Sequence, residues 1–493
     1  MTSRTVGRYA ARITQLELRR EFASASFKPL VAGEPDGPLV KTAVPGPRSL
    51  ELKSQLDKLQ NTAGVHFFVD AEKSIGNYVV DADGNIFLDC YGHIASLPLG
   101  YNHPDVLAAV RNPANITTIV NRPALGLYPT TDFVDRVKNA LLSVAPKGLN
   151  SVQLMMCGSC ANENAFKTAF IWYRTKQRGG KPPTEEDLIS SMTNKPPGSP
   201  SMSILCFNGA FHGRTYACLS ATHSKPIHKV DIPALDWPMA SFPRYKYPLE
   251  KHTKENKQED EKCLKEVDEL IKKWSAKNSP VAGILVEPIQ AEGGDHHGSA
   301  EFFNGLQRLS KKHGAAFIVD EVQTGGGPTG RMWAHEEWNL PESPDIMTFS
   351  KKMLLGGYYY REDFRVKESL RVFNTWMGDP SKLVMLEAVT KVIKRDNLLE
   401  NVRKSGDRLL QGLKELENDL GDRVNSARGK GTFCAIDARD AKLRDKIVAD
   451  MHAKGVHIGG CGANTIRFRP PLIFQVPHVE ILLDRLRQVV KAA

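Results

Sequence analysis

A lysine and an aspartate each follow a short apolar run that predicts a buried strand. Asp320 ends the run Phe317-Ile-Val-Asp320, and Lys351 follows Asp345-Ile-Met-Thr-Phe-Ser350, 31 residues further along the chain. That separation is about one crossover unit, so both side chains could face one ligand from nearby strand ends. A lysine in a dry cleft can attack an aldehyde, and an aspartate can keep a pyridinium nitrogen protonated. Taken singly, Asp320 is as readily a helix cap and Lys351 a solvated lysine.

A phosphate seat and an anion-binding arginine are predicted at two other strand ends. Cys157-Gly158-Ser159 follows a strand and opens a predicted helix, where free N–H groups can bind a phosphate. Phe211 and Arg214 follow a strand that ends at Phe207, so the ring could cover a flat ligand and the guanidinium could bind a carboxylate. From these residues alone, an ordinary capped helix start and a core phenylalanine beside a surface arginine remain open.

The elements that would position these side chains alternate between short apolar runs and helical stretches after about residue 130. Five runs without polar alternation, which are typical of parallel strands covered on both faces, occupy 151–156, 203–207, 281–286, 316–319 and 345–349. Leu264, Val267, Leu270, Ile271 and Trp274 have helical spacing in a charged crossover between two of these runs. The pattern predicts a doubly wound α/β domain with a mixed or parallel sheet, in which ligands bind beyond the carboxyl ends of the strands.

Both ends of the chain are expected to form a second, smaller α+β domain. Residues 30–48 predict an extended arm, and the Asp83-Gly84 turn joins two β-prone runs into a hairpin. Amphipathic helices are predicted from Asp379 to about residue 418, then strands at 432–436, 456–458 and 465–468, and a final helix. The predicted boundaries are 29–105 for the arm and part of the small domain, 106–379 for the large domain and 380–493 for the rest of the small domain.

Charge and composition exclude several classes of protein. The chain has 493 residues, and no uncharged apolar run approaches the ~20 residues of a membrane span. Its net charge is +10, but the remainder after residue 28 is only mildly basic and has no basic block, so no nucleic-acid partner is expected. Eight cysteines are spread along the chain, which indicates mostly reduced thiols.

The first 28 residues are predicted to be a mitochondrial transit peptide, which places the chain in the mitochondrial matrix. Residues 1–16 contain no acidic side chain, and Arg4, Arg8 and Arg12 recur every four residues, on one face of a helix. A frayed basic terminus without a targeting role is the alternative.

Eight sequence blocks, in this order, form a specific combination. They are Lys41-Thr-Ala-Val-Pro-Gly-Pro-Arg48, Asn121-Arg-Pro-Ala-Leu125, Met156-Cys-Gly-Ser-Cys160, Asp231-Ile-Pro, Val286-Glu-Pro-Ile-Gln, Val319-Asp-Glu-Val-Gln-Thr-Gly-Gly-Gly327, Thr348-Phe-Ser-Lys-Lys352 and Phe373-Asn-Thr-Trp376. The chain after residue 37 thereby resembles the class III (fold type I) pyridoxal-phosphate-dependent aminotransferases, and among them those acting on 4-aminobutyrate. The resemblance implies a homodimer that converts 4-aminobutyrate and 2-oxoglutarate to succinate semialdehyde and L-glutamate.

The resemblance also implies a role for each matching residue. Lys351 would bind the cofactor and move the proton, and Asp320 would pair with the pyridinium nitrogen. The cofactor would also be held by Gln323 at its phenolic oxygen, by Gly158 and Ser159 at its phosphate, and by Phe211 over its ring, while Thr375 would reach the cofactor phosphate of the other subunit. Arg214 would bind the carboxylate of 4-aminobutyrate. Glu292 and Arg467 resemble a gate pair, in which Arg467 is neutralised until 2-oxoglutarate enters and then binds its α-carboxylate.

Cys157 and Cys160 supply only two thiolates, whereas an iron–sulfur cluster usually needs four ligands. Animal members of the family pool these cysteines across the dimer around a [2Fe–2S] cluster, so the resemblance implies one here; two buried thiols are the alternative. Pro328 departs from vertebrate relatives, which generally have cysteine there, and this puts any intersubunit thiol chemistry at that position in doubt.

Three rival functions remain open. Another class III enzyme could act on ornithine or β-alanine, although Phe211, Arg214 and the cysteine pair favour 4-aminobutyrate; β-alanine and 3-aminoisobutyrate could share the site. A nucleotide-binding module could use the glycine-rich turns, and yellow colour with borohydride trapping on Lys351 would exclude it. The intact lysine, aspartate and gate pair argue against an interaction protein that binds the cofactor without turnover.

Overall fold

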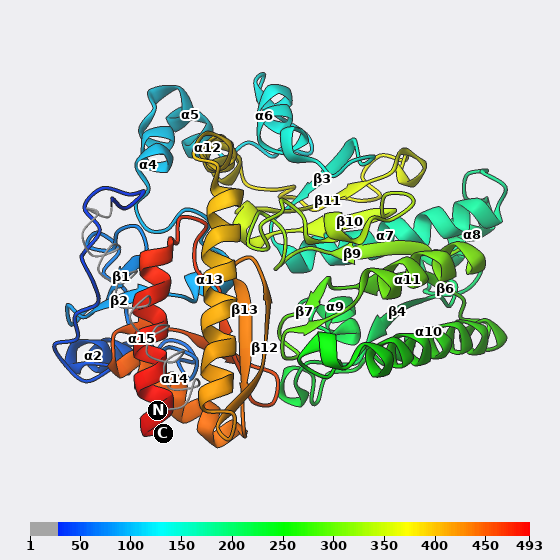
Figure 1. Cartoon of the computed structure of the whole chain (residues 1–493). Helices are drawn as coiled ribbons and strands as arrows, with labels where there is room; N and C mark the ends of the chain where they lie inside the picture. Colours follow the sequence, from blue (N-terminus) through cyan, green and yellow to red (C-terminus); the bar gives the residue numbers. More distant parts are fainter. Residues whose placement is uncertain (1–27) are drawn as a thin grey trace.

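The computed structural model describes residues 28–493, so almost all of the predicted transit peptide lies outside the described residues. Figure 1 shows a large sheet with its helices beside a smaller unit, in which the blue N-terminal elements lie next to the orange and red C-terminal ones. Within the described part of the chain, no helix combines the length and the apolar character needed to cross a membrane.

The large sheet has seven strands, and all but one run in the same direction. In spatial order the strands are β3 (Ser151–Met155), β11 (Gly356–Tyr360), β10 (Ile346–Phe349), β9 (Ala316–Asp320), β6 (Val281–Val286), β4 (Ser203–Phe207) and β5 (Met239–Ala240). The strands β10, β9, β6, β4 and β5 pair in parallel, whereas β11 is antiparallel to both of its neighbours. The five predicted strands are confirmed to within a residue at each end.

One edge of the sheet is antiparallel, which agrees with the prediction of a mixed or parallel sheet. Among residues 28–493, the strand at 151–155 pairs only with β11, in antiparallel register, and β11 was not predicted. The chain turns back directly after β10 through a short 3-10 turn, Lys351–Met353, and so returns along the same sheet. Glycine at 356 permits this return, because a Cβ there would overlap the backbone of Cys157.

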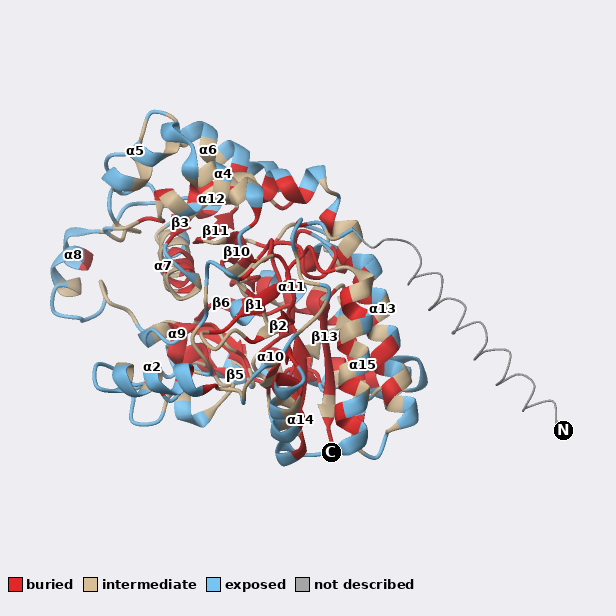
Figure 2. Ribbon diagram, turned by 90° about the vertical axis from the view of Figure 1, so that its left-hand side faces the viewer, coloured by how far each residue is buried: buried red, intermediate tan, exposed pale blue. Residues whose placement is uncertain are grey.

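Helices cover both faces of the large sheet, as the prediction of a doubly wound domain requires. On β9, Phe317 packs in the core that contains Val267 of α10 (Thr253–Ala276) and Phe302 of α11 (Ala300–His313). Its neighbour Ile318 faces the other way and packs in the core that contains Phe166 of α7 (Gly158–Gln177). Figure 2 shows the buried strands between helices whose outer faces are exposed. Burial on both faces explains the unbroken apolar runs.

The smaller unit combines both ends of the chain. Its sheets are β1 (Tyr78–Val80), β2 (Ile86–Asp89) and β14 (Val456–His457), and β12 (Val424–Lys430), β13 (Phe433–Ala438), β16 (Thr465–Phe468) and β15 (Gly459–Cys461). Its helices are α13 (Leu398–Asp419), α14 (Ala441–Ala453) and α15 (Val476–Ala492), with α13 and α15 side by side in Figure 1. Tyr78 and Leu88 of the N-terminal hairpin share one core with Leu413, Ile466 and Leu486. The exact domain boundaries stay a prediction.

The predicted hairpin and C-terminal helices are confirmed. Tyr78 pairs with Leu88, and Gly84 in the turn has a φ of +77°, a conformation that glycine adopts without strain. The remaining α-helices of the described part of the chain are α2 (Pro47–Asp57), α3 (Gly92–Ala95), α4 (Pro104–Arg111), α5 (Pro113–Asn121), α6 (Phe133–Ala140), α8 (Glu185–Ser191), α9 (Tyr216–Ala221) and α12 (Pro380–Arg395). The prediction did not include β12, β15 or α14.

Candidate active site

Asp320 and Lys351 lie at the carboxyl ends of two neighbouring parallel strands. Asp320 ends β9 and is in register with Thr348 of β10, and Lys351 follows β10 by two residues. Lys351 has a φ of +49°, which is uncommon for a residue with a side chain. A backbone held in this region costs of order 1–3 kcal/mol, and such strain often marks a functional site.

The Asp320 carboxylate is held by buried donors. It is 3% exposed, and its Oδ2 accepts hydrogen bonds from Asn162 Nδ2 at 2.8 Å and from His212 Nδ1 at 2.7 Å. Its Oδ1 accepts from the backbone N–H of Val322 at 2.9 Å. These contacts fix the direction of the carboxylate. Asn162 and His212 were not predicted as site residues, although Asn162 lies in the phosphate-seat motif and His212 in the Phe211–Arg214 motif.

Lys351 has the lowered pKa that a nucleophilic amine requires. Burial lowers its pKa to about 8, while the charge of Glu292 acts in the opposite direction and that of Arg467 lowers it. Its Nζ donates a hydrogen bond to Ile94 O at 2.9 Å. An amine of this pKa is partly neutral near neutral pH, so it can act as a nucleophile or a base.

The predicted phosphate seat lies against the segment that carries Asp320. Helix α7 begins at Gly158, and no acidic side chain occupies its first turn. A Cβ at Gly158 would lie 2.7 Å from Val322 Cγ1, and one at Gly213 would overlap Ser159 Oγ. The helix start, the Asp320 segment and the 211–214 loop therefore meet at one place. Free N–H groups at such a helix start can bind an anion.

Arg214 has no carboxylate partner among residues 28–493, so no acidic side chain of this region compensates its charge. Its guanidinium carbon lies 5.8 Å from the centre of the Phe211 ring, and its Nη2 lies 3.2 Å from His228 Nε2. The Phe211 N–H donates to Glu287 Oε1 at 2.8 Å. Burial, with the nearby charge of Asp320, raises the pKa of Glu287 well above its usual value.

Arg467, in contrast to Arg214, forms an ion pair with Glu292. Its Nη1 donates to Glu292 Oε1 at 2.6 Å, and its Nη2 donates to the Tyr91 hydroxyl at 3.1 Å. The Arg467 side chain is 3% exposed and that of Glu292 is 14% exposed. Burial alone would raise the pKa of Glu292, but the charge and hydrogen bonds of Arg467 hold it at about 2. The structure thus brings together the two residues of the predicted gate, which lie 175 positions apart.

Gln323 lies at the same junction and contacts Arg469, which was not predicted as a site residue. Arg469, one residue beyond β16, donates from Nε to Gln323 Oε1 at 3.1 Å. The spacing from Arg467 could have indicated Arg469 as a site residue. Residues two apart on an extended segment face the same side, and Arg469 is two positions after Arg467.

Three predicted site residues lie outside this group of contacts. Thr375 is exposed in the segment between β11 and α12 and makes no hydrogen bond within the described chain. Cys157 is exposed at the start of α7, and Cys160 is half-buried, with burial and the neighbouring Cys157 raising its pKa to about 11. Residues 28–493 contain no group of three or more His, Cys, Asp or Glu side chains that could hold a metal ion.

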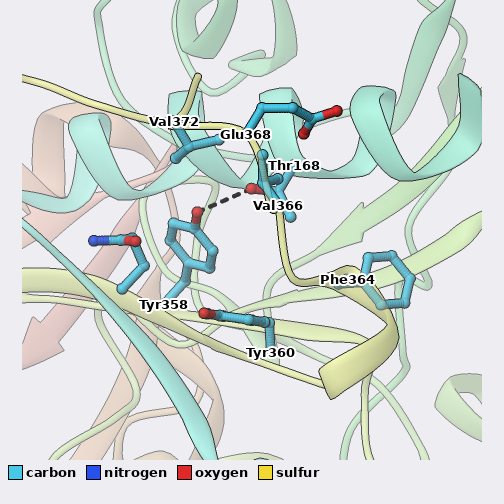
Figure 3. A pocket seen from close by; sticks show the side chains of 8 residues that line it. Thr168, Tyr358, Tyr360, Phe364, Val366, Glu368 and Val372 are labelled. Atoms are coloured by element: carbon cyan, nitrogen blue, oxygen red, sulfur yellow. Dashed lines mark hydrogen bonds between the residues drawn. The ribbon is translucent and has the colours of Figure 1, made fainter. Parts of the chain in front are cut away.

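Two cavities elsewhere contain none of the predicted site residues. Figure 3 shows one of about 60 Å³, lined by Tyr358, whose hydroxyl lies 2.9 Å from Thr168 Oγ1, and by the 364–372 segment. It has room for a few water molecules and is too small for a cofactor. The second, of about 610 Å³, lies between the 245–251 segment and the β12–α13 region.

Comparison with known proteins identifies the family. The family described as aminotransferase class-III matches residues 59–490. The chain is 54% identical to the probable mitochondrial 4-aminobutyrate aminotransferase of Caenorhabditis elegans, with 93% of this chain and 95% of that protein covered. It is 53% identical to the mitochondrial 4-aminobutyrate aminotransferase of Sus scrofa, with 94% and 93% covered.

Comparison with solved structures agrees with this family. Lysine aminotransferase from M. tuberculosis superimposes with a TM-score of 0.80 at 27% sequence identity, covering 90% of this chain and 99% of that one. An omega-transaminase from Thermomicrobium roseum has the same fold, with a TM-score of 0.74 at 22% identity and 92% and 99% covered. The chain belongs to the class III aminotransferases.

Proposed function

We propose that this enzyme transfers the amino group of 4-aminobutyrate to 2-oxoglutarate and forms succinate semialdehyde and L-glutamate. The observation that carries the proposal is the contrast between the two arginines. Arg214 has no carboxylate partner in the described chain, whereas Arg467 is neutralised by Glu292. A site with one available arginine suits a substrate with one carboxylate, and the second arginine can serve the substrate with two. Relatives named 4-aminobutyrate aminotransferase, at 50–54% identity, support the same substrate.

The residues at the junction fit pyridoxal phosphate, the cofactor of class III aminotransferases. When bound, the cofactor supplies an electron sink for the electrons of a broken C–H bond. Lys351 would hold its aldehyde carbon, Asp320 its ring nitrogen, Gln323 its phenolic oxygen, Phe211 its ring face, and Gly158 and Ser159 its phosphate. Three observations support this fit. The pKa of Lys351 is lowered, and the first turn of α7 contains no acidic side chain that would repel a phosphate. The amide nitrogen of Gln323 has no hydrogen-bond acceptor in the described chain.

Lys351 is the proton carrier in this proposal. In the first half-reaction its amine takes the proton from the carbon that carries the substrate's nitrogen, and in the second it returns a proton to the corresponding carbon of the product. A pKa of about 8 leaves both protonation states accessible near neutral pH, which a group that both accepts and donates requires.

Arg214 and Arg467 divide the recognition of the two substrates. Arg214 binds the carboxylate of 4-aminobutyrate, while Glu292 keeps Arg467 neutralised beside the amine-bearing carbon, where that substrate has no charge. When 2-oxoglutarate enters, Arg467 releases Glu292 and binds the α-carboxylate, and Arg214 binds the distal one. An arginine that lacks any partner in this buried position would be costly, which is why the gate needs Glu292.

Single-turnover experiments test the proposed function. Purified, cofactor-loaded protein mixed with 4-aminobutyrate should convert the cofactor to its amine form and release succinate semialdehyde, and 2-oxoglutarate should then restore it. Ornithine, β-alanine and 3-aminoisobutyrate serve as comparison substrates. A faster reaction with ornithine than with 4-aminobutyrate would contradict the proposal.

We further propose that the enzyme is a homodimer in which Thr375 reaches the cofactor phosphate of the other subunit. The exposure of Thr375 and of nearby apolar side chains such as Leu370, Leu127 and Tyr128 supports this arrangement. Light scattering on the purified protein should give twice the mass of the chain. A fully active monomer would contradict it.

Cys157 and Cys160 of two subunits are proposed to hold a [2Fe–2S] cluster. One chain offers two thiols, one exposed and one half-buried, and does not fit the cluster by itself, because a cluster needs four ligands. Two copies of the pair facing each other would supply them.

The matrix of mitochondria is the proposed location, because several relatives are named mitochondrial and the basic start of the chain has transit-peptide character. Residues 1–28 fused to a fluorescent protein should direct it to the matrix. Fluorescence that stays in the cytosol would contradict this.

A further inference from the structure

Gln323 has a defined amide orientation, because the one hydrogen bond that its side chain makes within residues 28–493 comes from a guanidinium. Arg469 Nε donates to Gln323 Oε1 at 3.1 Å. An arginine has only donors, so the atom of the amide that faces it must be the oxygen. No acceptor among residues 28–493 takes a hydrogen bond from Gln323 Nε2. The two amide N–H groups are therefore left for a bound molecule.

Arg469 is itself held on several sides and cannot rotate away from Gln323. It is 1% exposed, and its Nη2 donates a short hydrogen bond to the fully buried carboxylate of Asp295. Its Nη1 donates to Phe468 O at 2.9 Å, and its Cζ lies 3.3 Å from the centre of the Phe433 ring. A buried ion pair with this many partners is rigid, and Asp295 compensates its charge.

We propose that Arg469 is a positioning residue that holds the Gln323 amide oxygen, so that only the amide N–H groups are available to an oxygen of the cofactor. The inference rests on the proposed function, because it assigns Gln323 to the phenolic oxygen of pyridoxal phosphate. If the amide were rotated by half a turn, its oxygen would face the phenolic oxygen of the cofactor. Both atoms are acceptors, so the hydrogen bond between Gln323 and the cofactor would be lost. The smaller unit, through the residue that follows β16, thereby orients a side chain of the large sheet.

The test measures the affinity of cofactor-free protein for pyridoxamine phosphate by calorimetry, since this form binds without a covalent bond and no turnover is needed. Gln323→Leu should weaken binding roughly tenfold, the typical loss of one hydrogen bond to a charged group. Arg469→Lys keeps the charge but cannot hold the amide in the same way, and it should weaken binding by nearly as much. The double variant should bind no more weakly than Gln323→Leu alone, because both substitutions remove the same interaction.

Arg428→Lys is the matched control. Arg428 is 4% exposed and donates to Asp295 O at 2.8 Å, so it contacts the same segment as Arg469 but does not touch Gln323. Its substitution should leave the affinity within twofold of wild type. Equal losses in Arg428→Lys and Arg469→Lys would show a general structural role and overturn the inference.

Folding is checked by thermal unfolding of each variant. If Arg469→Lys does not fold, the pair Arg469→Met with Asp295→Asn removes both charges of the buried ion pair and takes its place in the same cycle. Unchanged affinity in the Arg469 variant, or losses that multiply in the double variant, overturns the inference alone. Failure of the wild-type protein to bind pyridoxamine phosphate would overturn the proposed function with it.

Discussion

The Lys351 amine donates to Ile94 O at 2.9 Å, whereas that of its neighbour Lys352 donates to Leu97 O and Pro470 O, both at 3.1 Å. Lys352 is fully buried, with a pKa that burial lowers to about 7. A low pKa therefore does not separate the two lysines. The two lysines differ in their accessibility to a ligand. Lys351 is half-buried and lies near Glu292 and Arg467, whereas the Lys352 amine is enclosed between backbone carbonyls.

Lys351→Ala is expected to abolish transamination and leave the protein folded, because the covalent hold on the cofactor and the proton carrier are both removed. Borohydride reduction followed by peptide mapping should place the cofactor on Lys351 in the wild type. Lys352→Met is the matched control: it should lower thermal stability, since two buried carbonyls lose their donor, but cofactor labelling should persist. Label on Lys352 would overturn the assignment.

The pH dependence of cofactor uptake should reveal the lowered pKa of Lys351. Only the neutral amine attacks an aldehyde, and the amine is protonated below its pKa, so the rate should rise with pH and level off above about 8. Stopped-flow mixing of cofactor-free protein with pyridoxal phosphate between pH 6 and 10 measures this. A rate that still rises tenfold per pH unit above pH 9 would mean that the amine has an ordinary lysine pKa.

Much of the fold was readable from the sequence because burial leaves a local signature. Strands buried on both faces are unbroken apolar runs, and the Asp83-Gly84 turn identifies its hairpin. The antiparallel β11 escaped prediction because its direction depends on the turn at Lys351–Met353, which local composition does not encode.

The site was only partly readable. Asp320 and Lys351 follow predicted strands, so spacing brought them together, whereas Glu292 and Arg467 were identified by resemblance. His212 and Arg469 were not predicted, because the position of a residue in a motif does not show which way its buried side chain points or which distant residue it contacts.

Arg214→Ala should raise the KM for 4-aminobutyrate. Loss of a hydrogen bond to a charged group costs about 1.5–3 kcal/mol, which corresponds to roughly 10- to 150-fold in binding. Steady-state kinetics provide the measurement, and butylamine, which lacks a carboxylate, provides the control. Butylamine should react equally in both proteins. A matching loss on butylamine would mean that Arg214 supports the fold of the site instead of the substrate.

Cys157→Ser and Cys160→Ser should each remove iron and leave most of the structure intact, if two subunits share a cluster. Iron and acid-labile sulfide are assayed on anaerobically purified protein. Cys263→Ser, in a buried cysteine far along the chain, is the control and should keep its iron. Wild-type protein without iron or sulfide would leave Cys157 and Cys160 as ordinary thiols.

Glu292→Ala should separate the two half-reactions, because the carboxylate is needed with only one of the two substrates. Without it, the almost fully buried Arg467 keeps its Tyr91 contact but loses its counter-charge. Glutamate supplies an α-carboxylate to Arg467, so its binding should improve, while 4-aminobutyrate leaves that cation uncompensated. An uncompensated buried charge costs about 3–5 kcal/mol; even a third of that shifts the preference about tenfold towards glutamate.

Single-turnover rates with 4-aminobutyrate and with glutamate, measured separately, provide the test. Glu292→Gln keeps the shape of the side chain and should behave like the alanine variant, because the missing charge is responsible. If both variants lose the same factor on both substrates, Glu292 is a structural partner of Arg467 and the gate does not operate. If Glu292→Gln retains the wild-type preference, a hydrogen bond is enough to hold Arg467, and its neutralisation by charge is not the basis of selectivity.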